Sequence, residues 1–299
     1  MRILLALVHY FKAEADPRHA SVNGALQTAR RQRAQAVVEA YRGLFDRPAT
    51  IDIESKRFQR GPGGGDELDI AVLTVPGCSL LDDPFLDRHR AVRIEVQPDN
   101  PRMLGFHVHE LFARLRAEYD LFCYSEDDLR PTDPDLFAKL VWFAGETGGQ
   151  RVLAPNRYEW NPAGAAIKTY IDGDLRGGFV DPLLAYRPDV DAIQLSALGR
   201  SRSFRRARNP HSGFFGVTQA QLGHWMRQPH WLDRDCSFVS PLESAATLGL
   251  AKTFPVFKPF AASAGFLELH HLDTRFSSLD LPWESQGLAG FAAEPSAGA

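Results

Sequence analysis

The feature that most constrains this chain is a short apolar run that ends in three adjacent carboxylates, Glu126, Asp127 and Asp128. The run, Leu121-Phe122-Cys123-Tyr124, has the composition of a buried strand. Ligands bind open α/β sheets where parallel strands end, so acids at this point favour a ligand site over the alternative of a solvated loop. Three like charges repel one another, and a bound divalent cation commonly neutralises such repulsion. Hard carboxylate oxygens suit Mg²⁺ or Mn²⁺ together with a phosphate ligand.

The surrounding pattern predicts a mostly parallel α/β sheet. Apolar strand-type segments cover about residues 2–8, 50–53, 70–75 and 91–96, and helical spacing covers about 26–45 and 104–117. Polar residues alternate along 91–96, which indicates an edge strand. Asp133-Pro134 predicts an N-cap and first helical position, with Leu136, Leu140 and Phe143 facing inward. Strands that alternate with helices over the first 155 residues indicate a parallel sheet with helices packed on it.

The second half of the chain carries weaker signals. Five arginines between Arg200 and Arg208 predict either a mobile solvated loop or a lid that binds a diphosphate. The segments 218–221 and 240–243 both match capping boxes, and the helix that follows the second is predicted to stop at Gly249. We expect residues 1–285 to form a single domain with halves at 1–155 and 156–285, and residues 286–299 to form a flexible tail. The glycine-rich segment 61–65 predicts a turn or flexible loop.

Composition excludes several classes of protein. The 299 residues carry a net charge of −3, so no global electrostatic case exists for binding nucleic acid or a membrane. No apolar run reaches the length of a membrane span, and Ile3–Val8 is expected to be the first strand rather than part of a signal peptide. The three cysteines are far apart, which argues against a disulfide framework or zinc site and fits a reducing cytoplasm.

The acidic run, preceded by Tyr119-Asp120, resembles the metal-binding strand of GT-A-fold glycosyltransferases, with Glu126 in the first position of a DxD-type motif. Three further segments agree with this resemblance. Residues 211–218 are similar to the small-residue strand before the acceptor helix, and residues 241–246 to the later segment whose acid faces the sugar. His270-His271 lies where several such enzymes supply a third metal ligand. The similarity extends over about residues 1–275, and the acidic strand is its specific part.

The resemblance implies a GT-A, Rossmann-like sheet with a less regular acceptor half. It also implies a metal-dependent glycosyltransferase that moves a sugar from a UDP- or GDP-linked donor to a glycan or glycolipid, as in surface polysaccharide biosynthesis. Such an enzyme works in the cytoplasm with at most peripheral membrane contact and without nucleic acid. The oligomeric state is not indicated. The implied roles are metal binding by Asp128, Glu126 and His271, nucleotide binding by His9, Tyr10, Glu126 and Asp127, acceptor binding by His211, Ser212 and Gly213, and catalysis by Glu243.

Several of these residues have a second, structural interpretation. His9 and Tyr10 either border the base or pack under a loop, and Glu243 either caps its own helix or acts as a base. Strand alternation separates His270 from His271, and we favour His271 as the ligand. The aromatic residues Trp225, Trp231 and Phe238 fit a core as well as a sugar platform.

The chain departs from the family pattern in two places, which keeps other functions open. The first motif position is Glu rather than Asp, and the segment around Glu243 lacks the Glu-Asp pair of many inverting members, so the base and the stereochemistry stay open. One alternative is a metal-dependent phosphohydrolase or nucleotidyltransferase, which calls for a further acidic pair on a neighbouring strand. The other alternative is a non-catalytic sugar-binding protein on the same fold.

Overall fold

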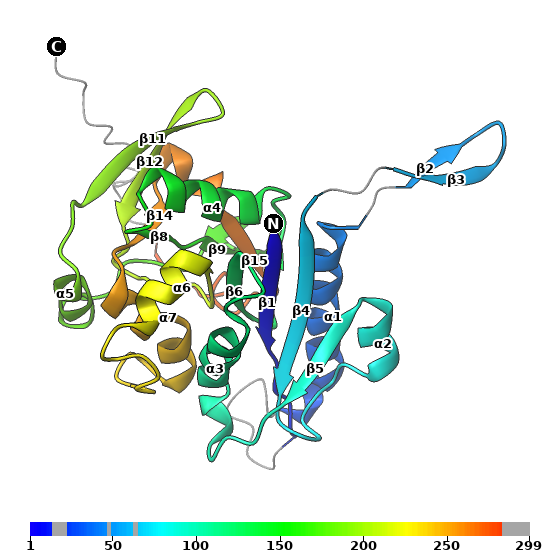
Figure 1. The fold of residues 1–299 in the computed structure, drawn as a ribbon, viewed down its shortest axis with the longest axis horizontal. Coiled ribbons are helices and arrows are strands. Elements are labelled where there is room, and N and C mark those ends of the chain that lie inside the picture. The colour runs from blue at the N-terminus through cyan, green and yellow to red at the C-terminus, as the bar shows by residue number, and fades with distance from the viewer. Residues whose placement is uncertain (14–22, 47–48, 62–64, 283–299) are drawn as a thin grey trace.

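The computed structural model describes residues 1–13, 23–46, 49–61 and 65–282. Its centre is a five-stranded sheet in the order β13-β6-β1-β4-β5 (Figure 1). The strands are β1 (Arg2–Val8), β4 (Glu67–Thr74), β5 (Ala91–Glu95), β6 (Leu121–Glu126) and β13 (Phe214–Thr218). All neighbouring pairs are parallel except β13 with β6, which is antiparallel. The protein therefore has a mixed α/β fold with a parallel-rich sheet, and the second half of the chain adds the antiparallel edge strand.

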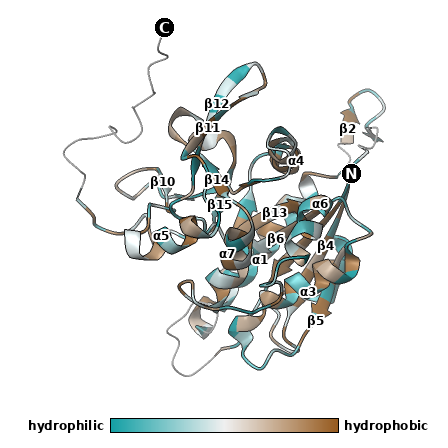
Figure 2. Ribbon diagram, turned by 60° about the vertical axis from the view of Figure 1, so that its left-hand side comes forward, coloured by the Kyte–Doolittle hydropathy of each residue, from teal (hydrophilic) through white to brown (hydrophobic). Residues whose placement is uncertain are grey.

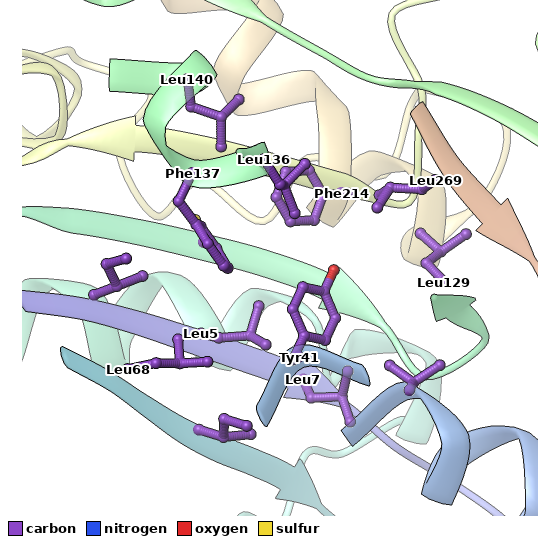
Figure 3. Packing of buried hydrophobic residues seen from close by; sticks show 14 of the residues in the cluster. Leu5, Leu7, Tyr41, Leu68, Leu129, Leu136, Phe137, Leu140, Phe214 and Leu269 are labelled. Carbon is purple, nitrogen blue, oxygen red and sulfur yellow. The ribbon is translucent and has the colours of Figure 1, made fainter. Parts of the chain in front are cut away.

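Helices cover both faces of this sheet. The helices of the described residues are α1 (Gln27–Gly43), α2 (Asp83–Arg88), α3 (Phe106–Leu115), α4 (Leu136–Glu146), α5 (Gly177–Tyr186), α6 (Gln219–Met226) and α7 (Pro241–Thr253), with short 3-10 helices at Gly24–Leu26, Pro101–Met103 and Ala261–Phe266. Of these, α5 lies away from the central sheet, beside α7 (Figure 1). Alternate residues of β1 enter separate cores: Leu5 and Leu7 pack toward α1, α2 and α4, while Leu4 and Ala6 pack toward α3, α6 and α7. Figure 3 shows the first core, in which Tyr41 of α1 lies over Leu7. The hydropathy colouring of Figure 2 is brown along much of the sheet.

Two smaller sheets lie beside the central one. Their orders are β10-β9-β15-β7 and β11-β12-β14-β8. The bounds are β7 (Leu129–Pro131), β8 (Val152–Leu153), β9 (Asn156–Trp160), β10 (Lys168–Tyr170), β11 (Ala192–Ala197), β12 (Arg200–Arg206), β14 (Val256–Pro259) and β15 (Glu268–His271). The β15 strand runs antiparallel to β7, which follows the acidic motif directly, so the end of the described chain returns to the end of β6.

The structure confirms several sequence predictions. The first strand, the long helix after it, the edge strand and the inward faces of Leu136, Leu140 and Phe143 are all present. Thr218 and Gln221 form the expected reciprocal capping box of α6. Most of the 61–65 segment and the 286–299 tail lie outside the described residues. In the part of the chain that is described, no helix is long and apolar enough to cross a membrane.

Local corrections concern the 50–53 segment and two helix ends. The 50–53 segment is a strand, β2 (Ala49–Asp52), but it pairs with β3 (Arg57–Arg60) in a separate hairpin that extends away from the central sheet (Figure 1). Asp133 does not cap α4, because its carboxylate accepts from the backbone N–H of Asp135 and from Lys139, and the N-cap is Asp135. The α7 helix continues past Gly249 to Thr253. A Cβ at Gly249 would lie 2.7 Å from the Trp225 ring, so this glycine permits close packing rather than ending the helix.

For the arginine-rich segment, neither the predicted mobile loop nor the predicted lid agrees with the structure. Residues 200–206 form β12, which pairs with β11 and β14, rather than a mobile loop or a lid. Phe204 is fully buried in this strand. The flanking arginines lie over aromatic rings, with Arg202 5.4 Å from the Phe266 centroid and Arg205 4.7 Å from that of Phe260. These cation–π contacts and strand pairing order a segment whose charge suggested solvent.

Candidate functional site at the end of β6

The three carboxylates of the acidic segment point in different directions. Glu126 is the last residue of β6, and its neighbour Asp127 begins the turn into β7. Alternation along β6 places Glu126 on the α3–α7 face with Tyr124, while Asp127 turns toward α1. Asp128 faces both α1 and β15. Each acid therefore has its own set of partners.

Asp127 is buried and is hydrogen-bonded by the side chains of Arg30 and His9. Arg30 of α1 donates to both of its oxygens at 2.8 and 2.9 Å, and Nδ1 of His9 lies 2.5 Å from Oδ2. Burial on its own raises the pKa of Asp127, but the charge of Arg30 and the hydrogen bond from His9 outweigh it and lower this pKa below its ordinary value. Asp127 is consequently an ionised carboxylate that joins β1, α1 and β6.

His9 is buried at the end of β1 and hydrogen-bonded at both ring nitrogens. Its ring is 1% exposed, and Nε2 accepts the backbone N–H of Leu80 at 2.9 Å. Nδ1 therefore carries the proton that is donated to Asp127. This burial agrees with a strand end packed under a loop, and the role of His9 in nucleotide binding stays a prediction. Tyr10 is half-buried against the core on the α3 face.

Asp128 has one engaged oxygen and one without a partner. Oδ2 accepts from Arg30 at 3.3 Å and lies 3.7 Å from Nε2 of His271. Oδ1 is buried and has no hydrogen-bond partner among the described residues. The adjacent His270 stacks on Tyr158, with centroids 5.0 Å apart and planes 6° apart, on the other face of the strand. The structure thus brings His271, and not His270, to the acidic segment, as strand alternation indicates.

Glu126 lies among charged and titratable groups on the opposite face. Its side chain keeps 26% of its surface exposed, and its oxygens lie 4.0 Å from Arg157 and 4.0 Å from Nε2 of His211. Burial and the charge of Asp128 raise the pKa of Glu126 to about 8, although Arg157 acts in the opposite direction. Near neutral pH Glu126 is therefore largely a protonated acid that can donate a hydrogen bond.

The predicted acceptor residues surround Glu126 but are well covered. His211 bonds Thr247 through Nδ1 at 3.0 Å, and burial lowers its pKa well below the ordinary value. The hydroxyl of Ser212 donates to the carbonyl of Pro155 at 2.9 Å. Gly213 has a φ of 57°. A Cβ there would lie 2.4 Å from Oε2 of Glu126, so only glycine allows this close approach.

A buried ionic network lies beside Glu126. Arg157 donates from Nε to Asp172 at 2.9 Å, and Lys258 donates to the same carboxylate at 2.9 Å and to the carbonyl of His211 at 2.8 Å. Burial opposes ionisation of Asp172, but Lys258 and Arg157 outweigh it and lower its pKa to about 2. The network fixes the position of Arg157 beside Glu126.

Glu243 lies in the first turn of α7 and is bonded to the hydroxyl of Ser240. That hydroxyl in turn accepts the backbone N–H of Leu242. The charge of Glu243 contributes to the raised pKa values of both Glu126 and Tyr124, so the start of α7 lies near these two side chains. The Tyr124 hydroxyl is buried without a hydrogen-bond partner in the described part of the chain. By contrast, Trp225 and Phe238 belong to the core, with exposed fractions of 1% and 4%.

The charge repulsion that suggested a metal ion is largely offset by arginines. Arg30 neutralises Asp127 and Asp128, and Arg157 lies beside Glu126. Over the described residues, no group of three or more His, Cys, Asp and Glu side chains is arranged to hold a metal ion. The donor atoms that fit a cation are the unpartnered Oδ1 of Asp128 and Nε2 of His271, with other positions left for phosphate or water oxygens.

Three residues of this site do not stand out in the sequence. Arg30 is one of three arginines near the start of α1. The orientation of the helix about its axis buries Arg30 rather than Arg31 or Arg33, and the sequence does not reveal this orientation. Arg157 and Glu159 alternate with aromatic residues on β9, and this period-2 pattern is the only local signal that both face the site.

No protein-family model matches the sequence, and no curated protein matches it. Similar solved structures include a "putative nucleotide-diphospho-sugar transferase" from Desulfovibrio desulfuricans G20, with 11% identity and a TM-score of 0.38 over 86% of this chain and 78% of that one. A CMP:2-keto-3-deoxy-manno-octonic acid synthetase complexed with CTP has 10% identity and a TM-score of 0.36, covering 86% of this chain and 90% of its own. A197 from STIV has 9% identity and a TM-score of 0.36, covering 86% and 81%. Similarities this low establish no family.

Proposed function

We propose that this protein is a metal-dependent glycosyltransferase that uses a nucleoside-diphosphate sugar, with its site at the carboxyl end of β6. The observation that carries the proposal is the pair of donor atoms on Asp128 and His271. Oδ1 of Asp128 is buried without a partner, and Nε2 of His271 lies 3.7 Å from Oδ2 of the same carboxylate. Asp128 follows closely after β6, at the end of parallel strands, which is where open α/β sheets bind ligands.

Asp128 and His271 would hold Mn²⁺ or Mg²⁺. When bound, such an ion neutralises charge on a departing diphosphate. Arg30 keeps both Asp127 and Asp128 in place, so the carboxylate of Asp128 is pre-oriented.

The opposite side of the acidic segment is suited to sugar hydroxyl groups. Glu126, largely protonated near pH 7, can donate a hydrogen bond to a hydroxyl while Arg157 lies beside it. Glu243 at the start of α7 is the candidate base for an acceptor hydroxyl, and to act it must exchange its bond with Ser240 for one with the substrate. We place the acceptor, a glycan or glycolipid, between this helix start and the segment that precedes β13.

The substitution Asp128→Asn tests this proposal. It keeps the shape of the side chain but removes the charge, and we expect metal-dependent turnover of a UDP- or GDP-sugar to fall about a hundredfold or more, since the cation contributes several kcal/mol. The matched control is Asp120→Asn at the other end of β6, where the carboxylate accepts only the backbone N–H of Arg2 among the bonds described.

Product analysis separates this function from its alternatives. Free nucleoside diphosphate together with a transferred sugar supports glycosyl transfer. Release of phosphate or pyrophosphate without sugar transfer indicates a phosphohydrolase or nucleotidyltransferase instead. Full turnover by Asp128→Asn would refute the assignment of this site.

A further inference from the structure

The carboxylate of Glu159 is completely buried behind His271. Glu159 lies on β9 with an exposed fraction of 0%. One oxygen lies 3.0 Å from Nδ1 of His271, and the other accepts the backbone N–H groups of Phe276 at 3.0 Å and Ser277 at 2.7 Å. Oε2 accepts both N–H groups, and with Glu159 ionised Oε1 is an acceptor as well, facing Nδ1 of His271.

This arrangement determines which nitrogen of His271 carries the proton. Because the carboxylate only accepts, Nδ1 must donate, and Nε2 of the neutral ring then presents its lone pair. Nε2 faces Oδ2 of Asp128 at 3.7 Å, which is too long for a hydrogen bond. Because Arg30 binds Oδ2, the atoms available to a shared cation are Nε2 of His271 and the unpartnered Oδ1 of the same carboxylate.

The backbone of His271 is fixed independently of its ring. His271 is paired with Leu129 across β15 and β7, and the N–H of Leu272 donates to the carbonyl of Asp128 at 2.9 Å. Asp273 then binds Arg33 of α1 at 2.8 Å. These contacts place the residue without a hydrogen bond to the ring itself, and the ring is bonded instead to Glu159.

We infer that Glu159 is a positioning residue, which holds His271 in the Nδ1–H tautomer and directs its Nε2 lone pair at a divalent cation shared with Asp128. This inference rests on the proposed function, because the cation is part of that proposal. Carboxylate partners of this kind orient metal-binding histidines and raise their basicity, and their loss typically weakens metal binding about 10–100-fold.

The substitution Glu159→Gln should reverse the tautomer. A glutamine has a single acceptor oxygen, and the two backbone N–H groups of Phe276 and Ser277 need it. The amide NH₂ group then faces Nδ1 of His271 and can only donate, so the proton moves to Nε2. A ring protonated at Nε2 has no lone pair for a cation on the side of Asp128.

The test uses the full-length protein and two measurements. The first is the Mn²⁺ dissociation constant, measured by electron paramagnetic resonance with Mn²⁺ alone, which we expect to rise about 10–100-fold in Glu159→Gln. In a His271→Ala background the same substitution should have no further effect. Glu268→Gln is the matched control, since this carboxylate lies on the neighbouring strand but binds Lys168 and Tyr170, and its Mn²⁺ affinity should equal that of the wild type.

The second measurement is independent of the metal. Nitrogen chemical shifts of the metal-free protein should show His271 as the Nδ1–H tautomer in the wild type and as the Nε2–H tautomer in Glu159→Gln. An unchanged tautomer, or an equal Mn²⁺ affinity in the two proteins, would overturn the role of Glu159 while leaving the proposed function intact. Absence of Mn²⁺ binding by the wild type would instead overturn the cation site and the proposed function with it.

Discussion

Replacing Arg30 by methionine should cost much of the stability of this protein. Arg30 is only 9% exposed and donates to both oxygens of Asp127, which is 5% exposed. The substitution keeps the apolar stem but leaves a buried carboxylate whose remaining described partner is the ring of His9. Removing one member of a buried ion pair costs about 3–5 kcal/mol, so we expect a loss of this size at pH 7.

The control is Arg33→Met, one helical turn further along α1. Arg33 pairs with Asp273 at 2.8 Å, but the two side chains are 27% and 29% exposed. A pair this exposed contributes about 0–1 kcal/mol. Urea unfolding of the wild type and both variants at pH 7 measures the difference. An Arg30→Met loss no larger than that of Arg33→Met would refute the argument that Arg30 neutralises a buried charge.

The stability lost in Arg30→Met should depend on pH, because the buried carboxylate of Asp127 can be protonated. In the wild type the lowered pKa of Asp127 means that this carboxylate stabilises the fold above the ordinary pKa of an aspartate, and that this contribution is lost as the pH falls further. Without Arg30, burial raises the pKa of Asp127, so protonation relieves the buried charge. The deficit of Arg30→Met should therefore shrink from pH 7 to about pH 5, and the double variant Arg30→Met, Asp127→Asn should recover most of it.

Two further predictions concern packing and charge elsewhere. The pKa of Asp172 is lowered to about 2, so its ionisation should contribute about 2 kcal/mol above pH 4 that is lost as the pH falls toward 2. Urea unfolding from pH 4 to pH 2 should show this fall in the free energy of unfolding in the wild type and not in Asp172→Asn. An equal dependence on pH in the two proteins would contradict the lowered pKa of Asp172. Gly249→Ala should destabilise by about 1–3 kcal/mol, because its Cβ would lie 2.7 Å from the Trp225 ring. Gly145→Ala in α4 meets no atom within 4 Å and should stabilise by about 0.5–1 kcal/mol, and a stabilised Gly249→Ala would show that the ring can shift.

The parts of the fold that could be predicted from the sequence depend on local periodicity. The apolar runs of β1, β4 and β6 and the helical spacing of α1 are consistent over many residues, so both their type and their parallel arrangement follow from the pattern. Short segments were less predictable. The 50–53 segment has strand composition, but its pairing within a separate hairpin depends on the turn that follows it. The arginines of β12 look solvated until the aromatic rings beneath them are known.

The sequence predicts where the candidate site lies but not which distant side chains contact its acidic residues. Acids at the end of a buried strand, and the alternation that selects His271, are visible in the chain. Arg30 and Glu159 act over 97 and 112 residues of sequence separation, respectively, and such contacts leave no local pattern. The contact of His9 with Asp127, 118 residues away, is likewise invisible in the sequence.

The most direct test of the central claim is thermal unfolding with UDP, GDP and CMP, each with and without Mn²⁺. A ligand at a hundred times its dissociation constant stabilises by about 2.7 kcal/mol, which raises the melting temperature by several degrees. We expect UDP or GDP to raise the melting temperature of the wild type only when Mn²⁺ is present, and we expect Asp128→Asn to lose this increase. Equal stabilisation without Mn²⁺, an undiminished shift in Asp128→Asn, or no shift with either diphosphate would contradict it.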